Sequence, residues 1–169
     1  MNPSKILLVY FSATGITKRF SEYICETLKI KSYRIKEKKP YTQSDFGNSI
    51  HDNTRCQLEQ RDEKSRPEII IEDFPNFENI NTIILGFPIW SYIAPRVVQT
   101  FLETKDLSGK RIIPFATSWK SPIGETEIPL HNSCPKAIWD KAVVFNQNSS
   151  KDLIKNWDFI YLYIFWHLK

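Results

Sequence analysis

Three hydroxyl side chains and a glycine stand within six residues near the start of the chain, in Ser12-Ala-Thr-Gly-Ile-Thr17. The hydroxyls of Ser12, Thr14 and Thr17 can donate hydrogen bonds to an anion. Gly15 can adopt a positive φ without strain, which lets the backbone approach a ligand closely. Hydroxyl and amide donors together suffice for a phosphate monoester. The chemistry that this cluster predicts is therefore the binding of a small phosphorylated molecule.

The loop stands between two elements that can position it. Residues 6–11 form a short apolar run, which is typical of a buried parallel strand. Phe20, Ile24 and Leu28 follow at a spacing of four, which predicts a helix from Thr17 to Leu28. A strand, a polar loop and a helix in this order bring backbone N–H groups and the positive end of the helix dipole to one point. The loop matches neither G-x-x-x-x-G-K-[ST] nor G-x-G-x-x-G, so neither a P-loop triphosphate site nor a dinucleotide fold is expected.

The segment 12–17 resembles the T/S-x-T-G-x-T loop with which flavodoxins hold the phosphate of FMN. Three further stretches resemble flavodoxins in order and spacing: Ile84-Leu-Gly-Phe-Pro-Ile-Trp90, then Ala94-Pro95 with Thr100-Phe-Leu-Glu103, then Gly109-Lys-Arg-Ile-Ile-Pro-Phe-Ala-Thr-Ser118. The resemblance covers roughly residues 5–144. It implies that FMN is the cofactor and that its phosphate is held by Ser12, Ala13, Thr14, Gly15, Ile16 and Thr17.

The fold class that the resemblance implies is α/β, an open five-stranded parallel sheet of order 2-1-3-4-5 with helices on both faces. We expect a single flavodoxin-like domain over residues 1–169. The predicted strands are Ile6–Phe11, Ser32–Ile35, Thr82–Gly86, Arg111–Ala116 and Ala142–Phe145. Pro95 is expected in the first turn of the helix that follows the third strand.

Two further loops would hold the flavin ring, because ligands of open α/β sheets bind at the carboxyl ends of the strands. Trp90 and Tyr92 offer flat aromatic faces for stacking. The residues expected on one side of the ring are Pro88, Ile89, Trp90, Ser91 and Tyr92, and those on the other side are Thr117, Ser118, Trp119, Ile123 and Gly124. Lys120, if it lies near N1 of the ring, would favour the reduced anionic flavin.

The composition of the chain restricts the kinds of binding partner and the cellular compartment that we expect. Lys and Arg number 23 against 19 Asp and Glu, and this net charge of +4 does not call for nucleic acid. Three scattered cysteines without a C-x-x-C pattern fit reduced thiols in the cytoplasm. Apolar runs are too short to span a bilayer. The three histidines have no metal-ligand spacing, so no metal site is expected.

The function that these observations favour is FMN-dependent electron transfer to a redox partner protein or a small-molecule acceptor. The flavin carries the chemistry, so no catalytic side chain is assigned. One alternative is an FMN-dependent NAD(P)H reductase of quinones or other small acceptors. Another is a degenerate flavodoxin-like domain that has lost its cofactor and serves as an interaction module. Turnover of NADPH with a quinone, and the yellow colour of a flavin protein, separate the three.

Two remaining stretches complete the expectations. Residues 42–66 are polar and are interpreted as a surface helix or long connection without chemistry of its own. A last helix is expected from about Ser149, with an unbroken apolar run over residues 159–166. One sheet face cannot cover such a helix on all sides, which favours a homodimer or a docked partner there.

Overall fold

The computed structural model describes residues 3–47, 49, 51–71, 74–119, 121–146 and 149. The last helix of the sequence analysis, with the homodimer expected there, and Lys120 lie outside these residues. Within the described part, no helix is both long and apolar enough to cross a membrane. The thiols of Cys25, Cys56 and Cys134 are free.

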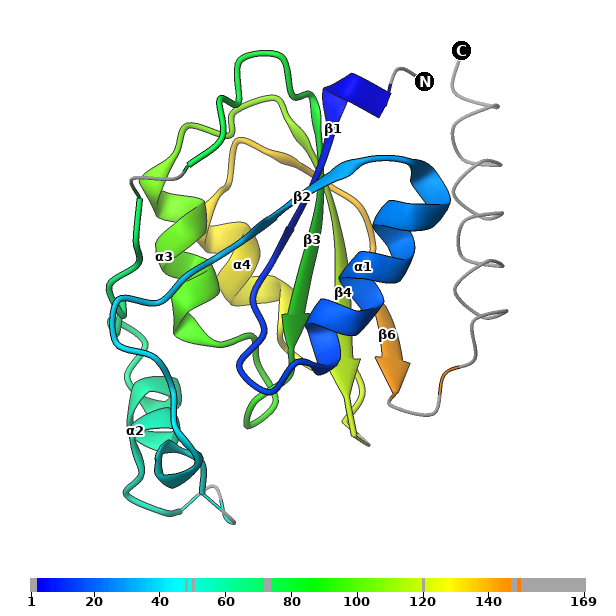
Figure 1. Cartoon of the computed structure of the whole chain (residues 1–169). Helices are drawn as coiled ribbons and strands as arrows, with labels where there is room; N and C mark the ends of the chain where they lie inside the picture. Colours follow the sequence, from blue (N-terminus) through cyan, green and yellow to red (C-terminus); the bar gives the residue numbers. More distant parts are fainter. Residues whose placement is uncertain are drawn as a thin grey trace.

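Parallel strands form a central sheet with helices on both of its faces (Figure 1). The strands are β1 (Ile6–Tyr10), β2 (Lys31–Arg34), β3 (Thr82–Pro88), β4 (Arg111–Ser118), β5 (Ile138–Trp139) and β6 (Val143–Asn146). The helices are α1 (Ile16–Leu28), α2 (Arg55–Arg61), α3 (Arg96–Thr104) and α4 (Glu127–Ser133), with short 3-10 turns at Pro3–Lys5 and Gln43–Asp45.

The strand order is β2-β1-β3-β4-β5, as predicted, and β6 also pairs with β4. The last position of the sheet is thus shared by two short strands. β5 pairs with the start of β4, at Arg111 and Ile112. β6 pairs with its end, from Phe115 to Ser118. The prediction of one strand over residues 142–145 missed β5, because a two-residue strand leaves too little alternation to detect.

Alternation along the strands divides the core into two layers. On β1, Leu7 and Val9 belong to the cluster beneath α3 and α4, whereas Ile6 and Leu8 belong to the cluster beneath α1. All five residues of β1 are buried. A strand covered on both faces needs apolar residues at every position, which explains the continuous apolar run in the sequence.

The helices differ from the prediction in detail. α3 begins at Arg96, so Pro95 precedes its first turn and serves as its N-cap. α4 was not predicted, since it has only seven residues and includes Pro129. α2 lies apart from both helix layers, below α3 in Figure 1, at the end of the molecule where the arrows of β3 and β4 point. The loops that follow β1, β3 and β4 meet at this same end.

Candidate functional site

Three loops converge on a cavity of about 150 Å³ at the carboxyl ends of β1, β3 and β4. The cavity receives residues from each of the three predicted segments. Its lining consists of Thr14, Ile16, Pro88, Ile89, Trp90, Thr117, Ser118 and Trp119. A parallel sheet brings the ends of its strands together in this way, which is why residues a hundred positions apart share one cavity.

The loop 12–17 has the backbone of an anion-binding turn. Gly15 has φ 87° and immediately precedes α1, and among the described residues no side chain caps this helix end. The Gly15 N–H donates to Ser12 Oγ at 3.1 Å, which closes the turn. Apart from Gly15 and its two chain neighbours, no described atom lies within 4 Å of where a Cβ on Gly15 would stand. The backbone here is therefore not crowded, and the helix dipole favours an anion at this helix end.

Thr14 and Thr17 occupy different environments within this loop. Thr14 is exposed and lines the cavity. Thr17 is buried, and its Oγ1 is hydrogen-bonded to Thr117 Oγ1 at 2.8 Å. That bond ties the start of α1 to the end of β4, so Thr17 fixes two of the three loops relative to each other. No local pattern indicates this pairing, because the two residues lie 100 positions apart.

The loop after β3 is a tight turn closed by two backbone bonds. Trp90 N–H donates to Ile93 O at 2.9 Å, and Ile93 N–H donates to Trp90 O at 3.1 Å. The two residues between them, Ser91 and Tyr92, have φ of 46° and 72°. Both lie in the left-handed region, which is uncommon for residues other than glycine. Trp90 lines the cavity, whereas 60% of Tyr92 is exposed to solvent.

The loop after β4 contributes the other wall. Trp119 is 69% exposed and also lines the cavity. Ile123 packs against the core, and Gly124 has φ 55° close to the carbonyl oxygen of Tyr92. Of the sixteen residues predicted for the site, eight line the cavity. The other eight flank it in the same loops: Ser12, Ala13, Gly15, Thr17, Ser91, Tyr92, Ile123 and Gly124.

The stretch 42–66, interpreted from sequence as lacking chemistry, supplies neighbours of the site. The ring of Trp90 makes edge contacts with Tyr41 just before this stretch, at 5.0 Å between centroids, and with Phe46, at 5.3 Å. Tyr41 donates its hydroxyl hydrogen bond to Glu59, and burial together with that carboxylate raises the pKa of the phenol. The sequence contains one signal of this contact, the aromatic residues Tyr41 and Phe46 at and near the start of the polar stretch. The spacing of apolar residues does not predict that they pack against Trp90.

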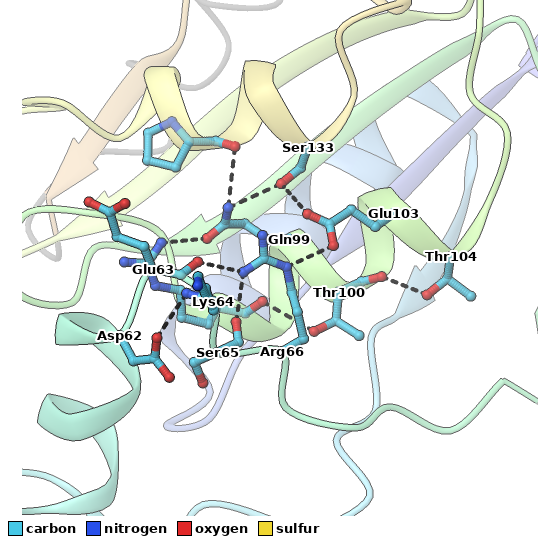
Figure 2. A network of polar contacts seen from close by, with 12 residues as sticks. Asp62, Glu63, Lys64, Ser65, Arg66, Gln99, Thr100, Glu103, Thr104 and Ser133 are labelled. Carbon is cyan, nitrogen blue, oxygen red and sulfur yellow. Dashed lines mark hydrogen bonds and ion pairs between the residues drawn. The ribbon is translucent and has the colours of Figure 1, made fainter.

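A second cavity, of about 380 Å³, lies between residues 63–66, α3 and α4. Its lining includes four members of a polar network, Arg66, Gln99, Glu103 and Ser133 (Figure 2). Glu103 accepts hydrogen bonds from Arg66 Nε at 2.7 Å and from Ser133 Oγ at 2.8 Å. Gln99 joins the network by donating to Ser133 at 3.0 Å. Because these groups already satisfy one another, the network serves to join the chain segments rather than to bind a ligand.

The Glu103 carboxyl makes stability depend on pH. The hydrogen bond from Arg66, followed by that from Ser133, lowers the pKa of Glu103. A carboxyl with a lowered folded-state pKa stabilises the fold above its unfolded pKa, and this contribution is lost as the pH falls below about 4.5 through the folded value. Glu103→Gln should therefore destabilise the protein at pH 7, by less than about 1 kcal/mol for a partly exposed pair. Urea unfolding should show the difference from wild type shrinking as the pH is lowered below about 4.5 and through the folded-state pKa. A difference that does not shrink, or one that appears equally in the exposed control Glu26→Gln, would contradict this assignment.

Comparisons with known proteins bear on the family and the fold of this chain. A family model described as flavodoxin matches residues 5–159. A candidate flavoprotein from Bacteroides uniformis ATCC 8492 is 38% identical, with a TM-score of 0.83 over 92% of this chain and 97% of its own. A candidate flavoprotein from Bacteroides eggerthii DSM 20697 is 34% identical, with a TM-score of 0.82 over 93% of this chain and 97% of its own. The flavoprotein of Lactobacillus acidophilus NCFM in complex with FMN is 20% identical, with a TM-score of 0.67 over 92% of this chain and 99% of its own. No curated protein matches the chain.

Proposed function

The chain belongs to the flavodoxin family, and from this we propose that it binds FMN at the three-loop cavity and acts as an electron carrier. The observation that carries the proposal is the amino end of α1 beside Gly15, where no side chain of the described residues caps the helix and the helix dipole suits a phosphate. An FMN phosphate there would receive hydrogen bonds from backbone N–H groups of the loop other than that of Gly15, which donates to Ser12, and from the exposed hydroxyl of Thr14.

The two walls would orient the ring of the cofactor. Trp90 and Trp119 both line the cavity and stand on different loops. Each offers an apolar face to an aromatic ligand. Ile16, Pro88 and Ile89 add apolar side chains to the lining and would shield the part of the ring that they cover from water. The flavin supplies the redox chemistry when bound, and the residues of this chain hold it and set its surroundings.

The small size of the cavity favours a carrier. At about 150 Å³ it is smaller than the roughly 300–1,000 Å³ of sites that enclose their ligands. The flavin would therefore be only partly covered, and its exposed edge would remain within reach of a redox partner protein or a small acceptor. Trp119, being 69% exposed, would form part of that contact surface.

Titration of the cofactor-free protein with FMN tests the proposal. We expect saturable binding with a shift of the visible absorbance of FMN. If the wild-type protein binds no FMN, the assignment is overturned. Mixing the loaded protein with NADPH and a quinone then distinguishes the two redox roles. A carrier consumes no NADPH by itself, whereas steady consumption would identify a reductase.

Trp90 provides a second test of the ring site. Because it lines the cavity, bound flavin should lose most of its fluorescence through contact with the indole. Trp90→Ala should restore the emission and weaken FMN binding by about 1–3 kcal/mol, the range for burying a large side chain. Trp139→Ala is the control. Trp139 lies on the far strand β5, and its ring packs on His131 of α4. Unchanged emission and affinity in Trp90→Ala would mean that this indole only fills the core.

A further inference from the structure

The turn at residues 90–93 holds a conformation that its own residues disfavour. Ser91 and Tyr92 are consecutive and both have positive φ, in a two-residue turn of the kind that favours Asn and Gly. Such strain persists only where the surroundings enforce it. Neither side chain explains it by packing inward, since Tyr92 is 60% exposed and Ser91 is half-buried. The groups that enforce it must therefore lie next to the turn.

Gln60 of α2 is the principal contact of this kind. Its side chain is buried, with 6% exposed, and its Nε2 donates to Trp90 O at 2.8 Å. Ala94 O and Ile93 O lie at 3.3 and 3.4 Å from the same nitrogen. One carboxamide thus gathers carbonyl groups from both ends of the turn. A turn whose carbonyl groups converge on one donor cannot change its backbone without breaking that contact.

The orientation of the Gln60 carboxamide follows from these contacts. Its Oε1 is buried and, among the described residues, has no hydrogen-bond partner. An unpaired buried acceptor is unfavourable. Rotating the amide by half a turn would nevertheless be worse, because Oε1 would then face three carbonyl oxygens. The unpaired oxygen therefore marks a side chain that is oriented by the turn it holds.

Three more contacts fasten α2 and its flank to the turn. Ser91 Oγ donates to Gln57 Oε1 at 2.6 Å, one helical turn before Gln60. Tyr41 and Phe46 pack edge-on against the ring of Trp90. Arg96 of α3 secures the helix itself, because its guanidinium donates to Gln60 O at 2.8 Å and to Glu59 O at 3.3 Å. These are carbonyls of the last turn of α2, which a cation at a helix carboxyl end stabilises.

We propose that α2 is a clamp that keeps the 90–93 turn in its left-handed conformation, with Gln60 and Gln57 as positioning residues for the wall of the cavity. The effect on FMN affinity rests on the proposed function, whereas the effect on the turn itself does not. Because the turn is already ordered in the free protein, binding of the ligand does not include the free-energy cost of ordering it. The clamp thus holds Trp90 ready at the cavity in the free protein.

Two variants and one matched control test the clamp. Gln60→Leu removes the donor while keeping a similar volume. Gln57→Ala removes only the contact to Ser91, at a half-buried position where misfolding is not a concern. Gln99→Leu is the control, because Gln99 is an equally buried carboxamide, with 4% exposed, that does not contact the turn. It accepts from Arg96 Nη1, whereas the bonds of Arg96 to α2 come from Nη2 and Nε, so the bonds that secure α2 remain in this variant.

Hydrogen exchange of the amides in residues 90–94 of the cofactor-free protein is the first measurement. We expect about tenfold or faster exchange in Gln60→Leu, a smaller increase in Gln57→Ala and wild-type exchange in Gln99→Leu. The second measurement is the Kd for FMN. This Kd should rise about tenfold in Gln60→Leu and should stay within about twofold of the wild-type value in Gln99→Leu. Circular dichroism and urea unfolding establish that each variant is folded.

The outcomes separate the clamp from the proposed function. Fast exchange in Gln60→Leu together with weaker FMN binding supports the clamp. Wild-type exchange in both Gln60→Leu and Gln57→Ala overturns the clamp. Fast exchange with unchanged FMN affinity overturns the role of Gln60 and Gln57 in positioning the wall of the cavity. Equal changes in Gln99→Leu also overturn the clamp, because they would trace the effect to general destabilisation. A wild-type protein that binds no FMN overturns the proposed function alone, and the exchange measurement then decides on the clamp.

Discussion

Thr14→Asp is expected to abolish FMN binding while making the cofactor-free protein more stable. Thr14 is exposed, lines the cavity and lies two residues before the first residue of α1. A carboxylate at this helix end interacts favourably with the dipole and should raise the free energy of unfolding by about 0.3–1 kcal/mol. The same carboxylate would repel a phosphate held by the loop. Stability and affinity should therefore change in opposite directions.

The size of the loss follows from the charges. Two unit charges about 4 Å apart near a protein surface repel by about 4 kcal/mol, and each 1.4 kcal/mol is a factor of ten. We expect the Kd for FMN to rise at least about a hundredfold. Riboflavin has the same ring without the phosphate, so its affinity should change by no more than a few fold. Isothermal titration with both ligands measures the two effects.

Thr14→Asn is the matched control, because it has the shape of aspartate without the charge. It should bind FMN with an affinity between those of wild type and Thr14→Asp. Equal losses of FMN and riboflavin in Thr14→Asp would place the phosphate elsewhere and leave only a steric effect. Equal affinities of Thr14→Asn and Thr14→Asp would likewise argue against a phosphate beside this residue.

Local patterns in the sequence were sufficient to predict the first strand and the first helix of the fold. The apolar run before residue 12 predicted a strand buried on both faces, and β1 is buried throughout. The apolar spacing through Phe20 and Ile24 predicted α1 to within one residue. Both signals are local, since burial sets the composition of a strand and the period of a helix directly. The strand order was predicted from the resemblance, and the sheet has it.

The contacts that hold the site together could not be predicted, because they join distant residues of ordinary type. Gln60 and Gln57 lie in a polar stretch with weak periodicity, and a glutamine that reaches three carbonyl groups looks in sequence like any surface glutamine. Thr17 was predicted as a phosphate donor by its place in the loop, yet its hydroxyl is bonded to Thr117. The left-handed pair Ser91 and Tyr92 had no signal, since neither residue favours positive φ.

Gly86 in the middle of β3 marks another contact across the sheet and gives the largest expected loss of stability. Gly86 pairs with Phe115 of β4. A Cβ on Gly86 would stand 2.3 Å from Cζ and 2.6 Å from Cε1 of that ring. Phe115 cannot readily move away, because it is fully buried and packs against Phe145 at 6.0 Å between centroids. A glycine in a strand interior is explained here by the ring that lies over it.

Gly86→Ala should therefore lower the free energy of unfolding by about 3 kcal/mol, at the upper end for an overpacked core. Phe115→Leu in the same chain should recover part of this loss, because it removes the atoms that a Cβ would meet. The coupling between the two changes, from urea unfolding of all four combinations, measures the steric term alone.

Gly109→Ala provides the contrasting control. A side chain at position 109 is disfavoured by the backbone conformation and not by a neighbouring atom. Gly109 has φ 71°, and apart from Gly109 and its two chain neighbours no described atom lies within 4 Å of where its Cβ would stand. Its replacement should cost only about 1–2 kcal/mol of left-handed strain and should not be relieved by Phe115→Leu. If Gly86→Ala were equally mild, or if Phe115→Leu rescued both glycine variants alike, the ring of Phe115 would have room to yield. The close approach of β3 and β4 at this position would then not explain the glycine.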